Sequence, residues 1–346
     1  MRAYAIALLV TAISLVPLGA AGQVEVVSEG PIRIALTGRL QTQINTSTAD
    51  SVYSTFEHRR ARLGAELTIE DWIEGRIEYN FAAQRLEDGW MNLAFDPMLE
   101  LQVGQFKKPF SRLELTSSAR LVPIEYGLRI RGVETGAEHH LLLDENVYIG
   151  RELGAQIHGQ IGPLGYALGV FNGSDQNTRD HNDEKSFAGR LNLKPFDAPF
   201  ELGAGASWRD LQLVDSLDEP FTEQGLAVEI DALWGGFRRP GLTLVAEVMQ
   251  AENFETRDPM VGAQGIVSWF QPLDAPRVEG IEPLFRASYG DPSTGFDGNS
   301  GVLLTPGINL YFQGRNRLML NFDYYMPELD VLDPEHAIRG QLQLFF

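Results

Sequence analysis

Basic side chains are clustered in the first third of the chain, in a pattern that could bind anions. Arg59, Arg60 and Arg62 fall within one short stretch, and Arg39 and Arg76 lie in the segments on either side of it. A guanidinium group presents a fixed fork of N–H donors that suits oxyanions, and rings of Arg or Lys line anion-selective pores. The alternative is that these arginines pair with glutamates in a ladder that stiffens the protein. The pattern leaves both interpretations open.

Residues 108–151 form the only long connection between the predicted elements, and they carry further basic candidates. Lys107 and Lys108 stand at the start of this connection, and Arg112 and Arg120 follow within it. Connections of this length in a compact protein are usually functional. Acidic residues oppose the basic ones along the segment, so its charge alone does not determine an ion preference.

Other kinds of chemistry find no support in the sequence. The chain has no Cys, which excludes disulfides, thiolate metal sites and cysteine nucleophiles. His139 and His140 adjoin Glu138, but adjacent side chains on an extended loop diverge and make a poor metal site. Gly203 and Gly205 lack the third glycine and the helix of a dinucleotide-binding loop. We therefore predict no catalytic residues, no metal site and no cofactor.

The N-terminus has the features of an export signal. Arg2 supplies a positive charge, residues 3–16 are apolar, and residues 17–22 are mostly small, as they are at a cleavage site. The apolar run is short for a transmembrane helix, which needs about 20 residues. We expect residues 1–22 to be a signal peptide and residues 23–346 to form one exported domain.

The remainder of the chain alternates polar and apolar residues with a period of two, which indicates β-strands. Pro283 and Pro306 fall inside two of the predicted strands, where each removes a backbone donor. The sixteen predicted strands span residues 32–45, 56–70, 73–83, 89–95, 99–107, 152–160, 164–172, 185–193, 200–212, 223–234, 241–252, 260–270, 277–289, 301–312, 315–326 and 336–346.

The connections between these strands alternate between short and long, apart from residues 84–88. A soluble sandwich has no reason to sort its connections in this way. A transmembrane barrel has short periplasmic turns and long external loops, and an even strand number returns both chain ends to the periplasm. We therefore predict an all-β fold, a 16-stranded antiparallel transmembrane β-barrel with an inward-folded third external loop. The lumen of such a barrel is too wide for side chains to fill, so it holds water.

Aromatic residues fall where a membrane barrel has its two interfacial girdles. Phe346 also ends the last strand, as in outer-membrane barrels, where this end resembles a signal to the barrel-assembly machinery. The residues expected near the periplasmic ends are Trp72, Phe95, Phe200, Trp234, Trp269, Phe270, Phe312 and Phe346. Those expected near the outer ends are Tyr79, Phe81, Tyr324 and Tyr325.

The overall charge is a poor guide to the permeant solute. The 346 residues include 28 Lys and Arg against 47 Asp and Glu, a formal net charge of −19. This balance excludes the basic footprint of a nucleic-acid-binding protein, so we predict no nucleic-acid partner. When residues are sorted by strand face, the polar face is close to neutral and the acidic surplus falls on the connections.

Several stretches resemble the phosphate-selective porin O/P family of Gram-negative outer membranes. The most specific is VGQFKKPFS (103–111) followed by LTSS (115–118), which resembles the family's entry to its constriction loop. The other similar stretches are FEHRRARLGAEL (56–67), IEGRIEYNFA (73–82), ELGAQIHGQIGPLGYALGVFNG (152–173) and IRGQLQLFF (338–346).

The resemblance implies a homotrimer of sixteen-stranded barrels in the bacterial outer membrane, in contact with lipid and lipopolysaccharide. Lys107 and Lys108 match the basic pair of the motif, and the run from Arg59 to Arg62 matches the family's arginines. Phosphate-selective members have a lysine-rich constriction, whereas no further Lys occurs in the loop of this chain.

We therefore expect passive diffusion of small hydrophilic solutes, with small anions such as phosphate favoured. A general or weakly cation-selective porin is the first alternative. A secreted or outer-membrane β-barrel enzyme is the second, and it would require a catalytic cluster that the sequence does not reveal.

Overall fold

The computed structural model describes residues 24–50, 53–133, 136–174, 176–180, 183–195, 198–214, 220–328 and 333–346. The predicted signal peptide, residues 1–22, lies outside the described residues. Among the described residues, no helix has the length and apolar character needed to cross a membrane.

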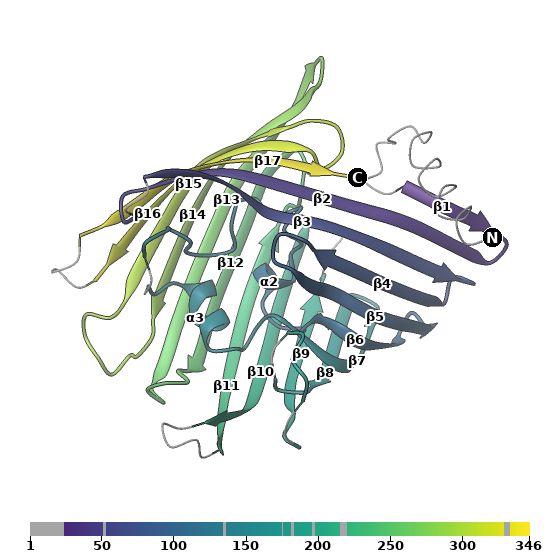
Figure 1. Cartoon of the computed structure of the whole chain (residues 1–346), viewed down its shortest axis with the longest axis horizontal. Coiled ribbons are helices and arrows are strands. Elements are labelled where there is room, and N and C mark those ends of the chain that lie inside the picture. The colour runs from purple at the N-terminus through teal and green to yellow at the C-terminus, as the bar shows by residue number, and fades with distance from the viewer. Residues whose placement is uncertain are drawn as a thin grey trace.

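Sixteen strands of the described chain, β2 to β17, pair antiparallel in chain order, and β17 pairs with β2 to close a barrel (Figure 1). The predicted all-β, 16-stranded antiparallel barrel is confirmed. The strands are β2 (Ile32–Ser47), β3 (Ser54–Ile69), β4 (Ile73–Asn80), β5 (Arg85–Asp96), β6 (Leu99–Lys107), β7 (Arg151–Ile161), β8 (Leu164–Phe171), β9 (Ser186–Leu193), β10 (Phe200–Val214), β11 (Pro220–Trp234), β12 (Gly241–Glu252), β13 (Pro259–Ala275), β14 (Val278–Asp291), β15 (Gly301–Tyr311), β16 (Arg317–Pro327) and β17 (Glu335–Phe345).

A further short strand, β1 (Val24–Glu29), precedes the barrel and was not predicted. It forms a hairpin with the first part of β2, where Val24 lies opposite Leu36. Gly30 turns the chain with a positive φ of 59°, a conformation that glycine adopts without a steric penalty.

The alternation within each strand separates outward-facing from lumen-facing side chains, as β17 illustrates. Ile338, Leu342 and Leu344 are each nearly half exposed, whereas Arg339 and Gln341 are buried inside the barrel. The outer face of β17 is therefore apolar. Full burial of a large aliphatic side chain away from water is favourable by roughly 1.5–3 kcal/mol.

Two of the predicted girdle aromatics point inward, and their placement on the outer face was wrong. Phe270 is buried and packs edge-on against Tyr311, with ring centroids 5.3 Å apart. Tyr325 is buried and its hydroxyl accepts a hydrogen bond from the Ala137 N–H at 2.8 Å. Both directly follow an outward-facing aromatic residue, and successive side chains on a strand point to opposite faces.

Strand β5 begins four residues before the predicted start at residue 89. Its register with β4 shifts between Glu78 and Tyr79, which lie opposite Asp88 and Leu86. The extra residue, Glu87, belongs to a β-bulge that interrupts strict alternation and leaves two successive acidic side chains buried. Because the bulge breaks the alternation of polar and apolar residues, the sequence pattern does not reveal that β5 begins at Arg85.

Pro283 and Pro306 both lie within strands, as predicted, and they pair with Ile308 and Phe285 respectively. The β15–β16 pairing is interrupted between Leu304 and Gly307. The interruption is expected, because proline has no N–H to donate to the neighbouring strand.

Candidate functional site: the loop and cavity inside the barrel

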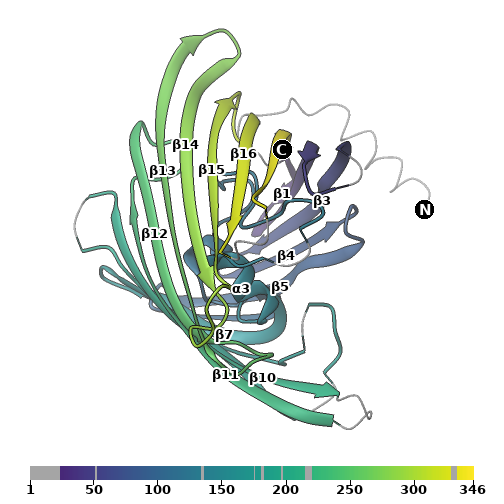
Figure 2. The ribbon, with the colours of Figure 1, turned by 90° about the vertical axis from the view of Figure 1, so that its left-hand side faces the viewer.

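The connection from Lys108 to Gly150 runs through the interior of the barrel and carries two short helices, α2 (Arg112–Leu115) and α3 (His139–Glu145). Figure 2 shows α3 enclosed by the strands. Buried wall side chains hold the loop by hydrogen bonds from widely separated strands. Gln41 donates to the Ser118 carbonyl at 3.1 Å, and Asn321 accepts from the Ile124 N–H at 2.7 Å.

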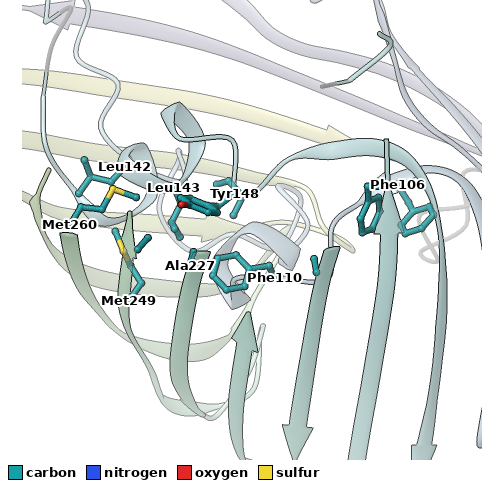
Figure 3. Packing of buried hydrophobic residues seen from close by; sticks show 12 residues of the cluster. Phe106, Phe110, Leu142, Leu143, Tyr148, Ala227, Met249 and Met260 are labelled. Carbon is teal, nitrogen blue, oxygen red and sulfur yellow. The ribbon is translucent and has the colours of Figure 1, made fainter. Parts of the chain in front are cut away.

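An apolar cluster fastens the second half of this loop to the inner wall (Figure 3). Leu142 and Leu143 of α3 are buried against Met249 and Met260, which project inward from β12 and β13. Water fills the lumen of an open barrel, so large apolar side chains on the inner wall require a covering segment. The loop provides that cover, and the protein's hydrophobic core lies between loop and wall.

On the other side of the loop lies a cavity of about 720 Å³. Eight basic side chains line it, against four carboxylates. The basic side chains are Arg39, Arg59, Arg60, Arg62, Arg76, Arg85, Lys107 and Arg151. The carboxylates are Glu78, Asp88, Glu114 and Asp144. Six of the nine basic residues predicted from the sequence therefore meet in one place.

The central acid of this cluster is Glu125, which comes from the loop. Its carboxylate lies 2.9 Å from Arg59 and 3.2 Å from Arg60, and it accepts a hydrogen bond from Gln43 at 2.8 Å. Burial alone would raise the pKa of the Glu125 carboxyl, but the guanidinium groups of Arg60 and Arg59 lower it well below its usual range. Glu125 is therefore ionised at neutral pH and neutralises part of the arginine charge.

Arg62 and Arg76 extend the network along the wall. Arg62 pairs with Glu78 and Glu87, at 2.9 Å each, and Arg76 pairs with Glu78 at 2.7 Å and with Asp88 at 3.3 Å. These pairs form an arginine–glutamate ladder between neighbouring strands. The predicted arginine–glutamate ladder is therefore confirmed, and its arginines also line the cavity.

Arg39 differs from the other guanidinium groups in the cavity. Among the described residues it has no carboxylate within ion-pair distance, and it donates to the hydroxyls of Ser118 at 2.5 Å and Ser117 at 3.5 Å. Its charge is therefore balanced only by more distant groups. This makes Arg39 the strongest candidate for direct contact with an anion.

Lys107 lies at the loop side of the cavity. Its ammonium is 3.1 Å from the Glu114 carboxylate and 5.0 Å from the centre of the Tyr126 ring. Glu114 also lies 3.2 Å from His140 Nε2. Burial would raise the pKa of the Glu114 carboxyl, but Lys107 and His140 hold it far below its usual range. Burial would likewise lower the pKa of His140, but its hydrogen bond with Glu114 raises it.

Three residues of the predicted set, Lys108, Arg112 and Arg120, lie outside the lining of this cavity. Lys108 is buried beside Glu152 at 3.5 Å and donates to the Val147 carbonyl at 2.6 Å. Arg112 pairs with Asp231 across the barrel, and Arg120 is exposed in a turn of the loop. The loop bends sharply between these positions, which sequence spacing does not reveal.

Arg85, Arg151, Tyr126 and His140 line the cavity but were not selected from the sequence. Arg151 is the first residue of β7, so the alternation of inward and outward side chains along that strand could have identified it. Tyr126 and His140 carry no such signal, because they lie on irregular parts of the loop. Elsewhere, His139 lies close to two glutamates of the wall, Glu229 and Glu247, with possible ligand atoms within 4.8 Å of one another. The positions of these three residues in the sequence do not reveal that they meet.

Comparison with solved structures shows the same architecture at low sequence identity. The anion-selective porin from Comamonas acidovorans is 10% identical, with a TM-score of 0.63, 91% of this chain covered and 100% of the other. The OmpF–daunomycin complex from Salmonella typhi is 13% identical, with a TM-score of 0.62, 93% of this chain covered and 100% of the other. OprB from Pseudomonas putida is 12% identical, with a TM-score of 0.61, 91% of this chain covered and 94% of the other. No curated protein matches the sequence.

A sequence model of one family covers more than half of the chain. The description of that family is phosphate-selective porin O and P, and residues 34–227 match it. The matched region runs from β2 into β11 and includes the arginine cluster and the whole loop. The chain therefore belongs to the phosphate-selective porin O and P family and is an outer-membrane channel protein.

Proposed function

We propose that this protein conducts small hydrophilic solutes passively and favours anions weakly over cations. The observation that carries the proposal is the lining of the cavity, where eight basic groups face four carboxylates although the whole chain has a net charge of −19. A net positive constriction favours anions, because charged side chains at close range raise the local counter-ion concentration.

The preference is weak because most of the basic groups are paired. The arginines of β3 share Glu125, Glu78 and Glu87, so much of their charge is cancelled within the wall. Arg39 retains its charge without such a pair. Phosphate is the permeant suggested by the family name, and paired guanidinium groups still offer donors to its oxygens. The anion-selective porin among the similar structures agrees with this direction.

The proposal also covers the export of the protein, its insertion into the membrane and its assembly into trimers. Residues 1–22 direct export and are removed, and residues 23–346 insert as one domain, with residues 108–151 as the constriction loop. Three copies associate in the outer membrane, in contact with lipopolysaccharide. The assembly machinery recognises the C-terminal strand, which ends in Phe346. In the folded barrel the backbone of Phe346 pairs with that of Gly38 at 2.7 and 3.0 Å, next to the closing pair of strands. No enzymatic activity is part of the proposal.

Reversal potentials in planar bilayers test the ion preference. In a tenfold KCl gradient an ideally anion-selective channel gives about 59 mV, and a twofold to threefold preference gives about 15–25 mV of the same sign. A value of the opposite sign would contradict the proposal and favour the cation-selective alternative.

A further inference from the structure

A second polar cluster lies inside the barrel, away from the cavity. It joins His139 of α3 to Glu229 of β11 and Glu247 of β12, and all three side chains are fully buried. His139 Nε2 lies 3.6 Å from Glu229, and Nδ1 lies 4.0 Å from Glu247. One ligand atom from each residue falls within 4.8 Å of the other two.

Within the described structure, the imidazole of His139 forms no hydrogen bond. Neither ring nitrogen of His139 has a hydrogen-bond partner, and the Oε2 atom of Glu229 has none either. Leaving a buried polar atom unpaired costs about 1–3 kcal/mol. The Nε2 atom of His139 and the Oε2 atom of Glu229 lie 3.6 Å apart, too far for a hydrogen bond, which indicates a group that binds between them.

The remaining oxygens of the two glutamates are held in place. Glu229 Oε1 accepts the Arg112 N–H at 3.1 Å, and Glu247 Oε1 accepts the Leu113 N–H at 2.6 Å. Gln264 donates to the second oxygen of Glu247. Such outer contacts orient ligand side chains in metal sites.

The network around the cluster holds one more carboxyl group than basic groups. Four carboxylates belong to this network, and three cations accompany them. The carboxylates are Glu201, Glu229, Asp231 and Glu247, and the cations are Arg112, Arg190 and Lys194. The imidazole of His139 is the nitrogen donor of the cluster, and a neutral imidazole binds a metal ion through a ring lone pair.

We propose that His139, Glu229 and Glu247 bind one divalent transition-metal ion, with Zn²⁺ as the best match. One imidazole nitrogen and two carboxylate oxygens suit Zn²⁺, which binds them at about 2.0–2.2 Å. Ca²⁺ and Mg²⁺ prefer an all-oxygen set and fit less well. The ion links α3 to two wall strands and thereby fixes the constriction loop across the lumen.

Calorimetric titration of Zn²⁺ into the chelator-treated, detergent-folded full chain tests the site. We expect one ion per chain, and at least about tenfold weaker binding for His139→Gln and for the isosteric Glu247→Gln. His158→Gln is the matched control, because His158 lies in the lumen beside a single carboxylate, Glu100, at 3.9 Å. Heat-modified migration in gels establishes that each variant is folded.

A second measurement is independent of channel activity. Zn²⁺ should raise the temperature of heat modification of the wild type and the control, but not of the two ligand variants, because an ion that binds only the folded state stabilises it. Absence of stoichiometric Zn²⁺ binding by the folded wild type, or equal binding by folded His139→Gln, would overturn the proposal.

Discussion

Replacing Glu125 by Gln should increase the anion preference of the channel. Glu125 is the shared partner of Arg59 and Arg60, and its carboxylate lies directly behind the cavity. The substitution removes one negative charge and keeps the shape of the side chain. Gln also retains an oxygen that can accept from Gln43, which limits the structural damage.

The expected change in the anion-to-cation permeability ratio follows from the dimensions of the cavity. A volume of about 720 Å³ corresponds to a sphere of about 5.6 Å radius, so a centred ion lies about 8 Å from a carboxylate in the wall. In a water-like dielectric the interaction with one unit charge at that distance is about 0.5 kcal/mol, so removing that charge raises the anion concentration and lowers the cation concentration by about 2.3-fold each. The permeability ratio therefore rises about fivefold at low salt. Screening at about 0.1 M salt, where the Debye length is about 10 Å, reduces the change to about twofold.

The assay is the reversal potential in a tenfold KCl gradient, where a twofold change in the ratio shifts the potential by about 10–15 mV in the anion direction. Glu282→Gln is the matched control, because Glu282 is also a buried carboxylate but, among the described residues, forms no ion pair with a basic side chain of the cavity lining. An unchanged potential in a folded Glu125→Gln variant, or an equal shift in the control, would refute the local electrostatic argument.

The remaining predictions concern single positions in the same region. Lys107→Glu should move the reversal potential toward cations, whereas Lys108→Glu should mainly lower the heat-modification temperature, because Lys108 is buried against Glu152. Arg39→Gln should reduce the anion preference in bilayers, since this guanidinium is not cancelled by an ion pair. The raised pKa of His140 means that its charge, and the stability that this charge adds, are present at low pH and lost as pH rises through that pKa. Anion preference should therefore fall from acidic to alkaline pH, and His140→Gln should remove most of that change.

Several features of the fold could be read from local sequence patterns. A strand with lipid on one side and water on the other must alternate, so segments such as residues 336–346 show their two faces directly. The predictions failed where local structure departs from this rule. The bulge at Glu87 hid the start of β5, and the adjacent aromatics near Trp269 were assigned to one face although they point to opposite faces.

Local sequence patterns alone predict a sixteen-stranded barrel, a group of arginines near β3 and a long loop after β6. Tertiary structure alone decided which of these charges act together. Glu125 meets Arg60 from 65 positions away, and His139 meets wall glutamates on two distant strands. The path of an irregular loop through the lumen depends on many weak contacts with the whole wall. No short stretch of sequence contains the information needed to place it.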